Sequence, residues 1–164
     1  MLKKVVSPVK HLLIISCSKS KNNLLKTYGA AKLPALEGYD GKLFLTIRKA
    51  LREGLGKNVD VLIISAKYGL LKSTEEISYY EERMTKPKAQ EIRDSVLSKL
   101  INHINGQNYK KIFVMMGRDY LGAISGLSSL TDIPIDVIQM EKIGKAQQKL
   151  KNLLLKINSQ TEVS

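Results

Sequence analysis

The sequence has few of the side chains from which disulfides and metal sites are built. Its 164 residues include one cysteine, Cys17, and two histidines, His11 and His103. One cysteine excludes an internal disulfide, and this set of residues matches no zinc-ligand spacing. The Gly-x-Gly-x-x-Gly and Walker phosphate-loop motifs are also absent from the sequence, so no motif supports a dinucleotide or NTPase site. We therefore expect neither a metal nor another cofactor.

Long hydrophobic runs are missing as well. A helix needs about 20 mostly apolar residues to span a bilayer, and no run in the chain approaches that length. The segment after Met1-Leu2-Lys3-Lys4 is too short for a signal peptide and is interrupted by Pro8 and Lys10. We expect a cytoplasmic protein with no membrane partner, and the sequence does not indicate its oligomeric state.

Acidic residues are scarce, because 15 Asp and Glu oppose 27 Lys and Arg and leave a formal net charge of +12. The excess is uneven: residues 1–36 hold seven lysines, residues 142–157 hold five, and neither segment contains an acid. A surplus of this size favours polyanions. We expect a nucleotide or nucleic acid as partner, and a merely solvated lysine-rich surface is the alternative interpretation.

The pattern of apolar residues predicts an α/β fold. Apolar runs bounded by polar or turn residues are typical of buried strands, and apolar residues at helical spacing indicate helices. The expected strands cover residues 11–16, 61–64, 112–116 and 133–138, and the expected helices cover 41–53, 87–104, 120–125 and 144–157. This order predicts one three-layer α/β domain over residues 1–164, with a mostly parallel sheet of about four strands and helices on both faces. Residues 1–10 are expected to form a loose arm, and residues 22–40 a long connection without a clear strand.

Polar and cationic side chains follow three of these strands. They are Ser16, Cys17, Ser18, Lys19 and Lys21 after the first, Ser65, Lys67, Tyr68 and Gly69 after the second, and Gly117, Arg118, Asp119 and Tyr120 after the third. Neighbouring parallel strands end at the same edge, where ligands of open α/β sheets bind. Cations, hydroxyls and backbone N–H groups suit a phosphate, a carboxylate or a polarised carbonyl. The alternative is that these residues only solvate the strand ends.

Three of these residues are candidate catalytic groups: Cys17, Lys21 and Lys67. Cys17 is the one thiol, and neighbouring lysines favour the nucleophilic thiolate; the alternative is a small residue packed at a strand end. Tyr68 and Tyr80 are candidates for stacking on a base or covering an anion, unless they belong to the rim of the core. Lys19, Arg118 and the hydroxyl and glycine positions are candidate substrate-binding residues. Glu81 and Glu82 are the nearest acids in the sequence for acid–base work, and the alternative is a solvated pair.

Several segments together resemble an uncharacterised family of bacteria, archaea and phages. They are residues 13–21, which contain Cys17-Ser18-Lys19-Ser20-Lys21, residues 39–44, residues 64–71, which contain Ala66-Lys67-Tyr68-Gly69-Leu70-Leu71, and residues 80–84. That family resembles the peroxide-stress YaaA proteins in its Cys-x-Lys-x-Lys opening. Cys17-Ser18-x-x-Lys21 is also similar to the Cys-Ser-x-x-Lys segment of archaeosine synthase, although Asn22-Asn23 stands where those enzymes have Pro-Tyr. The archaeosine enzymes modify a 7-deazaguanine base in transfer RNA, and the resemblance implies a fold like that of uracil-DNA glycosylase.

Two functions from different classes remain open. The first is an enzyme that acts on a nucleobase, nucleoside or nucleic acid, with 7-deazaguanine-type base modification as the reaction that the resemblance implies. The second is a non-catalytic DNA- or RNA-binding stress protein that uses its lysine-rich segments. An interaction module without a ligand is a third interpretation.

Overall fold

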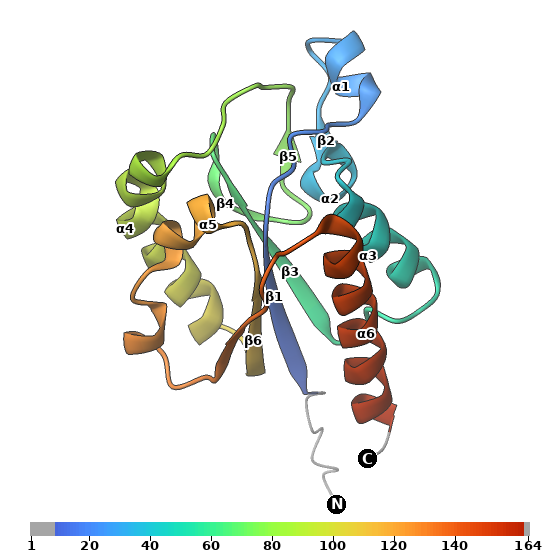
Figure 1. The fold of residues 1–164 in the computed structure, drawn as a ribbon, viewed down its shortest axis with the longest axis vertical. Coiled ribbons are helices and arrows are strands. Elements are labelled where there is room, and N and C mark those ends of the chain that lie inside the picture. Colours follow the sequence, from blue (N-terminus) through green and yellow to red (C-terminus); the bar gives the residue numbers. More distant parts are fainter. Residues whose placement is uncertain (1–8, 163–164) are drawn as a thin grey trace, which may run out of the picture.

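A five-stranded sheet runs through the centre of the computed structural model, which describes residues 9–162 (Figure 1). The order across the sheet is β4-β3-β1-β6-β7, and all neighbouring strands are parallel except β3 and β4. The strands are β1 (Lys10–Ser16), β3 (Val59–Ser65), β4 (Gly69–Lys72), β6 (Tyr109–Met115) and β7 (Ile135–Val137). The mostly parallel α/β architecture expected from the sequence is confirmed.

β1 occupies the middle of the sheet because its side chains are apolar on both faces. Leu12, Leu13, Ile14 and Ile15 are all fully buried, which is typical of a parallel strand covered on both sides. Leu12 and Ile14 belong to one hydrophobic cluster, and Leu13 and Ile15 belong to a second cluster on the opposite face. The registers of β1 with β3 and β6 bring the carboxyl ends of these three strands to the same edge.

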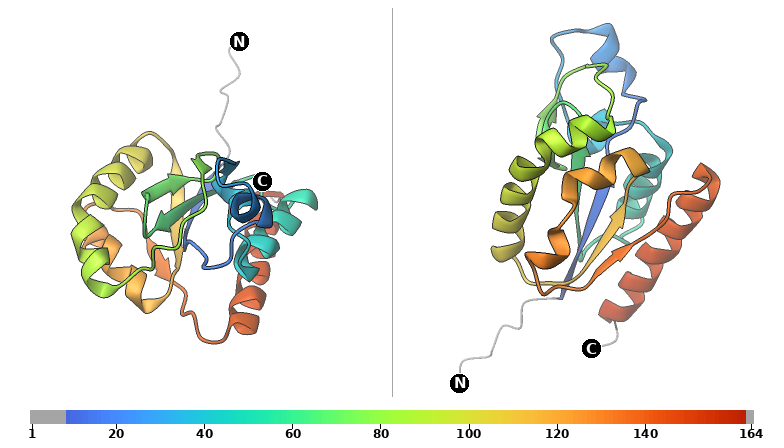
Figure 2. Two further views of the ribbon diagram at one scale, coloured as in Figure 1. Left: turned by 90° about the horizontal axis from the view of Figure 1, so that it is seen from above. Right: turned by 60° about the vertical axis from the view of Figure 1, so that its left-hand side comes forward.

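Helices cover both faces of this sheet (Figures 1 and 2). One face carries α4 (Lys86–Asn105), α5 (Arg118–Leu121) and two short 3-10 turns (Gly122–Ile124 and Leu127–Ser129), and the other carries α3 (Lys42–Arg52) and α6 (Ile143–Glu162). The start of α4 follows from local chemistry. Thr85 Oγ1 accepts a hydrogen bond of 3.2 Å from the Lys88 N–H, and Pro87 lies in the first turn, where no backbone donor is needed.

The sheet has one strand more than the sequence predicts, because β4 turns back along β3. Only residues 66–68 separate these two strands, and Ser65 pairs with Gly69. Gly69 has a φ of 71°, a left-handed backbone conformation that three-residue hairpin loops favour and that glycine adopts without strain. The prediction ended the second strand without a hairpin because four residues are too few to show a clear alternation of apolar and polar residues.

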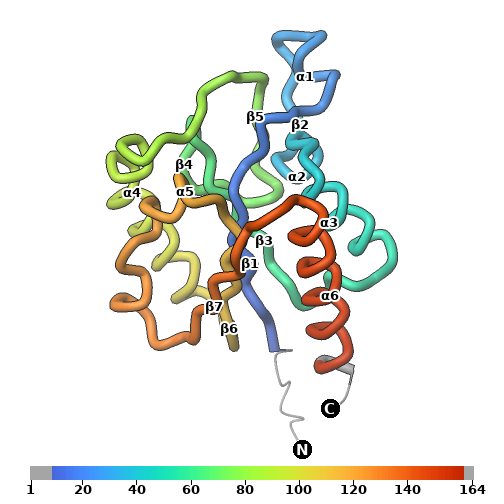
Figure 3. The backbone as a smooth tube through the Cα atoms, in the orientation of Figure 1, coloured from blue at the N-terminus to red at the C-terminus, as the bar shows by residue number. Residues whose placement is uncertain are grey.

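The connection over residues 22–40 is more regular than expected. It contains α1 (Asn23–Thr27), the two-residue strand β2 (Leu33–Pro34) and α2 (Ala35–Gly38), and β2 pairs antiparallel with β5 (Glu76–Ile77) in a separate small sheet. The expectation that this connection contains no strand was wrong, because β2 lies within it. Figure 3 shows α1 and β2 beyond the carboxyl ends of the central strands, so this connection lies on the side where the candidate site was expected.

The predictions for the last strand and for the N-terminal arm have different outcomes. β7 begins directly after Pro134 and is an edge strand, as proline predicts. Most of the expected N-terminal arm lies outside the described residues, and Lys10 already belongs to β1. Among residues 9–162, no helix combines the length and the apolar character that crossing a membrane requires.

Candidate functional site

Side chains from the three central strand ends meet at the carboxyl edge of the sheet. Cys17 Sγ, just after β1, lies 3.2 Å from the hydroxyl oxygen of Tyr120, which α5 supplies after β6. Lys21 Nζ and Lys67 Nζ lie 4.2 Å and 5.7 Å from the ring centroid of Tyr80. The strand-end site, as we call it, consists of Cys17, Lys21, Tyr39, Ser65, Lys67, Tyr68, Tyr80 and Tyr120.

A buried chain of hydroxyl groups forms the floor of the strand-end site. Ser65 Oγ accepts hydrogen bonds from the backbone N–H groups of Lys67 at 3.1 Å and Tyr68 at 3.0 Å. Since these bonds occupy both of its lone pairs, Ser65 donates its own proton to the Tyr80 hydroxyl at 2.9 Å. The Tyr39 hydroxyl lies 2.5 Å from that of Tyr80. The hydroxyl groups of Ser65, Tyr39 and Tyr80 together carry three protons, but only two hydrogen bonds join these groups. One tyrosine proton is therefore not used within the chain.

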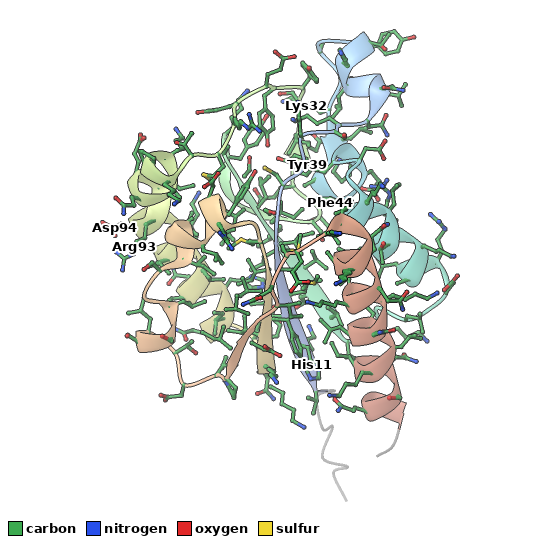
Figure 4. All side chains as sticks on the ribbon, in the orientation of Figure 1. His11, Lys32, Tyr39, Phe44, Arg93 and Asp94 are labelled. Atoms are coloured by element: carbon green, nitrogen blue, oxygen red, sulfur yellow. The ribbon has the colours of Figure 1, made fainter. Side chains whose placement is uncertain are left out.

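Three of the four phenols of this site are held in their protonated form, in which they can donate a proton. Burial raises the pKa of Tyr39, Tyr80 and Tyr120, and the neighbouring Cys17 raises each of the three pKa values further. The hydrogen-bond partner of Cys17 is the Tyr120 phenol rather than an imidazole. His11 lies at the other end of β1, away from Tyr39 (Figure 4).

Two lysines flank Tyr80 without a carboxylate partner. Within the described residues, neither Lys21 nor Lys67 has a carboxylate oxygen within 4.0 Å of Nζ. Lys21 is half-buried, and its Nζ donates to the Lys19 carbonyl at 3.3 Å. Burial lowers the pKa of Lys21, while Cys17 and Glu81 oppose that effect. Two cations near one aromatic ring, free of ion pairs, suit an anionic ligand.

Local hydrogen bonds explain how the chain holds this geometry. Ser18 Oγ donates to the Ser20 carbonyl at 2.6 Å and accepts from the Gly41 N–H at 3.1 Å. These bonds fix the loop after β1, and they occupy the hydroxyl that the sequence assigned to substrate binding. Across the site, the Tyr68 hydroxyl lies 3.0 Å from Ser78 Oγ and accepts from the Ser78 N–H at 3.2 Å.

The other residues expected at the site lie around it. Ser16 ends β1, Lys19 is exposed in the loop after it, Gly69 opens β4, and Gly117 caps α5. Arg118 is exposed on α5 and, in the part of the chain that the structure describes, makes no hydrogen bond or ion pair. Of the expected acids, Glu81 accepts a 2.6 Å hydrogen bond from the Tyr79 hydroxyl, and Glu82 pairs with Lys88 at 3.2 Å.

Sequence reasoning missed two members of this neighbourhood, Tyr39 and Arg83, and gave no role to a third, Tyr120. Tyr39 is fully buried and belongs to a connection without a clear pattern. Tyr120 was noted at a strand end, but its contact with Cys17 depends on the turn of α5. Arg83 is exposed, and its positive charge opposes the rise in the pKa of Tyr120. Two signals were available. Tyr120 stands four residues after the third apolar run, and Tyr39 and Arg83 lie in the segments 39–44 and 80–84, which carry the family resemblance.

Comparison with known proteins gives a family without an assigned activity. A family model described as a family of unknown function, DUF6884, matches residues 12–152. No curated protein and no solved structure matches the chain. The matched range includes every residue of the strand-end site and all five strands of the central sheet except the first two residues of β1. The chain therefore belongs to this family of unknown function, DUF6884.

Proposed function

We propose that this protein is an enzyme that acts on a nucleobase, a nucleoside or a nucleic acid at the strand-end site. The observation that carries the proposal is the pair of lysines, Lys21 and Lys67, which flank Tyr80 without a carboxylate partner in the described residues. A half-buried thiol, Cys17, lies close enough to Lys21 to oppose the effect of burial, which lowers the pKa of that lysine. Anion-binding groups next to a nucleophile are what a reaction on a phosphate-bearing substrate needs.

Four basic side chains bind the anionic part of the substrate. Lys21 and Lys67 hold phosphate or carboxylate oxygens, and the exposed Lys19 and Arg118 extend the positive surface outward. The buried Tyr39–Tyr80–Ser65 hydroxyl chain forms the floor on which the ligand rests.

Cys17 supplies the nucleophile. Its sulfur forms a bond to an unsaturated carbon of the base, and the electron pair displaced from that carbon's multiple bond takes up the thiol proton. The similarity of Cys17, Ser18 and Lys21 to the archaeosine synthase segment supports 7-deazaguanine-type base modification, and the uracil-DNA-glycosylase-like fold that it implies belongs to the same proposal.

A non-catalytic DNA- or RNA-binding role is the second candidate. It is favoured by the net charge of +12 and by the absence of acids from residues 1–36 and 142–157. The YaaA-like opening supports the same role. In this case the exposed lysines of α6, rather than the strand-end site, would contact the phosphates.

A thermal-shift panel of nucleobases, nucleosides and nucleotides tests the first proposal. We expect stabilisation by one ligand class, and Lys21→Ala and Lys67→Ala should each weaken its binding by about 1–3 kcal/mol, the range for a charge-assisted hydrogen bond. Lys145→Ala on α6 is the matched control and should leave binding unchanged. Cys17→Ser should keep binding but abolish turnover.

Salt dependence separates the two candidates. A protein that binds duplex DNA through its phosphates loses affinity with a slope near −0.9 per neutralised phosphate on a log–log plot, whereas a small ligand in the strand-end site shows a weak slope. Equal affinity of wild type, Lys21→Ala and Lys67→Ala for every ligand of the panel would refute the strand-end site as the place of binding.

A further inference from the structure

A cavity lies between α4 and the β3–β4 hairpin and shares no lining residue with the strand-end site. Its volume is about 350 Å³, within the range of small-molecule sites. The lining residues are Leu62, Leu70, Lys72, Glu75, Lys99, Asn102 and His103. Leu62 and Leu70 are buried members of the core, so the cavity combines an apolar floor with a polar rim.

The rim carries more positive than negative charge. Within residues 9–162, neither Lys72 nor Lys99 has a carboxylate oxygen within 4.0 Å of its Nζ. The one acid of the rim, Glu75, is partly engaged, because its Oε1 accepts a 3.2 Å hydrogen bond from the Lys72 N–H. The side chain of Asn102 adds an amide donor to the same rim.

A hydrogen-bonded chain fixes the imidazole of His103 at this rim. The Tyr109 hydroxyl donates to Asp60 Oδ2 at 2.7 Å, so its oxygen is free to accept. His103 Nε2 lies 2.7 Å from that oxygen and is therefore the protonated nitrogen of the neutral ring. Nδ1 is then left as the nitrogen that takes up a proton when the ring becomes charged.

The surroundings of His103 favour its neutral form. Burial lowers the pKa of His103, Lys72 and Lys10 lower it further, and Asp60 opposes them. These groups face the ring from β4, β1 and β3, and Tyr109 faces it from β6. A bound anion would act in the opposite direction, because a nearby negative charge favours the protonated ring.

We propose that this cavity is a second ligand site, which binds a small organic anion. Lys72, Lys99 and His103 pair with the oxyanion group. Leu62 and Leu70 contact the apolar part of the ligand, and Asn102 donates a further hydrogen bond. The site is independent of the reaction proposed for the strand-end site.

Benzenesulfonate is a suitable probe, because it joins an apolar ring to an oxyanion whose charge does not change between pH 5.5 and 7.5. Its binding is followed by ¹H–¹⁵N NMR on the full chain. The imidazole signals are easily assigned, since the chain has two histidines and His103→Gln removes one set. We expect shifts at the backbone amides of Leu70, Lys72 and Asn102 and at the His103 ring.

Lysine variants test whether the probe binds in this cavity. Lys72→Ala and Lys99→Ala should each weaken binding about tenfold, whereas Lys145→Ala on the opposite face of the sheet and the double variant Lys21→Ala/Lys67→Ala should bind as wild type does. Affinity should rise about 3- to 10-fold as the pH falls from 7.5 to 5.5, because anion and imidazole proton bind together. His103→Gln should remove that rise.

Each opposite result overturns the second ligand site. No binding at millimolar benzenesulfonate would do so, as would shifts confined to the strand-end site. Unchanged affinity in folded Lys72→Ala and Lys99→Ala, judged by intact spectra, would show that the probe binds elsewhere. A pH dependence that persists in His103→Gln would show that His103 does not pair with the anion and would overturn the site as proposed.

Discussion

Ser65→Ala should destabilise the fold strongly although it removes a single oxygen atom. Ser65 is fully buried, and its Oγ takes part in three hydrogen bonds, with the N–H groups of Lys67 and Tyr68 and with the Tyr80 hydroxyl. A hydrogen bond contributes about 0.5–1.5 kcal/mol net, and a buried group left without a partner costs about 1–3 kcal/mol. Water can reach the turn at Tyr68, which is partly exposed, and can replace some of the lost hydrogen bonds. We therefore expect a loss of about 2–4 kcal/mol in the free energy of unfolding.

Urea unfolding followed by tyrosine fluorescence measures this loss, since the chain has seven tyrosines and no tryptophan. Ser98→Ala is the matched control. Ser98 is exposed on α4 and makes no side-chain hydrogen bond in the part of the chain that is described, so its replacement should change stability by no more than about 0.5 kcal/mol. A Ser65→Ala loss as small as that of the control would show that the three hydrogen bonds of Ser65 contribute little to stability.

A double-mutant cycle measures how much the Ser65–Tyr80 hydrogen bond contributes to the loss of stability. Tyr80→Phe deprives the Ser65 proton of its acceptor and also breaks the bond to Tyr39. Because both single variants remove the Ser65–Tyr80 bond, the double variant should be less destabilised than the sum of the two by about 0.5–1.5 kcal/mol. Strict additivity would mean that Ser65 donates its proton elsewhere.

Two further predictions concern the loop after β1 and the pH dependence of stability. Gly41→Ala should cost about 1–3 kcal/mol in urea unfolding, because an added Cβ would lie 2.6 Å from Ser18 Cβ, whereas Gly29→Ala, with nothing within 4 Å, should be nearly neutral; equal effects would contradict the clash. The free energy of unfolding should fall as the pH drops from 7.5 to 5.5, because burial lowers the pKa of His11 from 6.5 and the unfolded chain therefore binds the proton first. His11→Leu should reduce that slope without abolishing it, since His103 titrates in the same direction, and an unchanged slope would exclude His11 as its source.

The central sheet could be predicted from the sequence because each long strand carries its own signal. The apolar runs around Leu12, Ile63 and Val114 are continuous, since both faces of these strands are buried. Pro134 and Pro87 mark a strand start and a helix start by removing backbone donors. These signals depend on near neighbours in the chain, so one sequence is enough to find them.

The hairpin and the hydroxyl chain could not be predicted in this way. β4 is four residues long, which is too short for a clear period. The Tyr39–Tyr80 bond joins residues 41 positions apart, and the Cys17–Tyr120 contact joins residues 103 apart. The residues next to a tyrosine do not determine which distant hydroxyl it will contact. The rule that ligands bind at the carboxyl ends of strands nevertheless predicted the edge of the sheet where these side chains lie.

The strand-end site separates the groups that hold the fold from those available to a ligand. Tyr39 and Ser65 are fully buried, while Lys67 is exposed and Lys21 and Cys17 are half-buried. Removal of a buried hydroxyl should therefore lower stability first and affect binding through the loosened floor. Removal of a lysine or the thiol should change binding or turnover at nearly constant stability. If Lys21→Ala unfolded the chain as readily as Ser65→Ala, the lysine would be a part of the core rather than a group held ready for an anion.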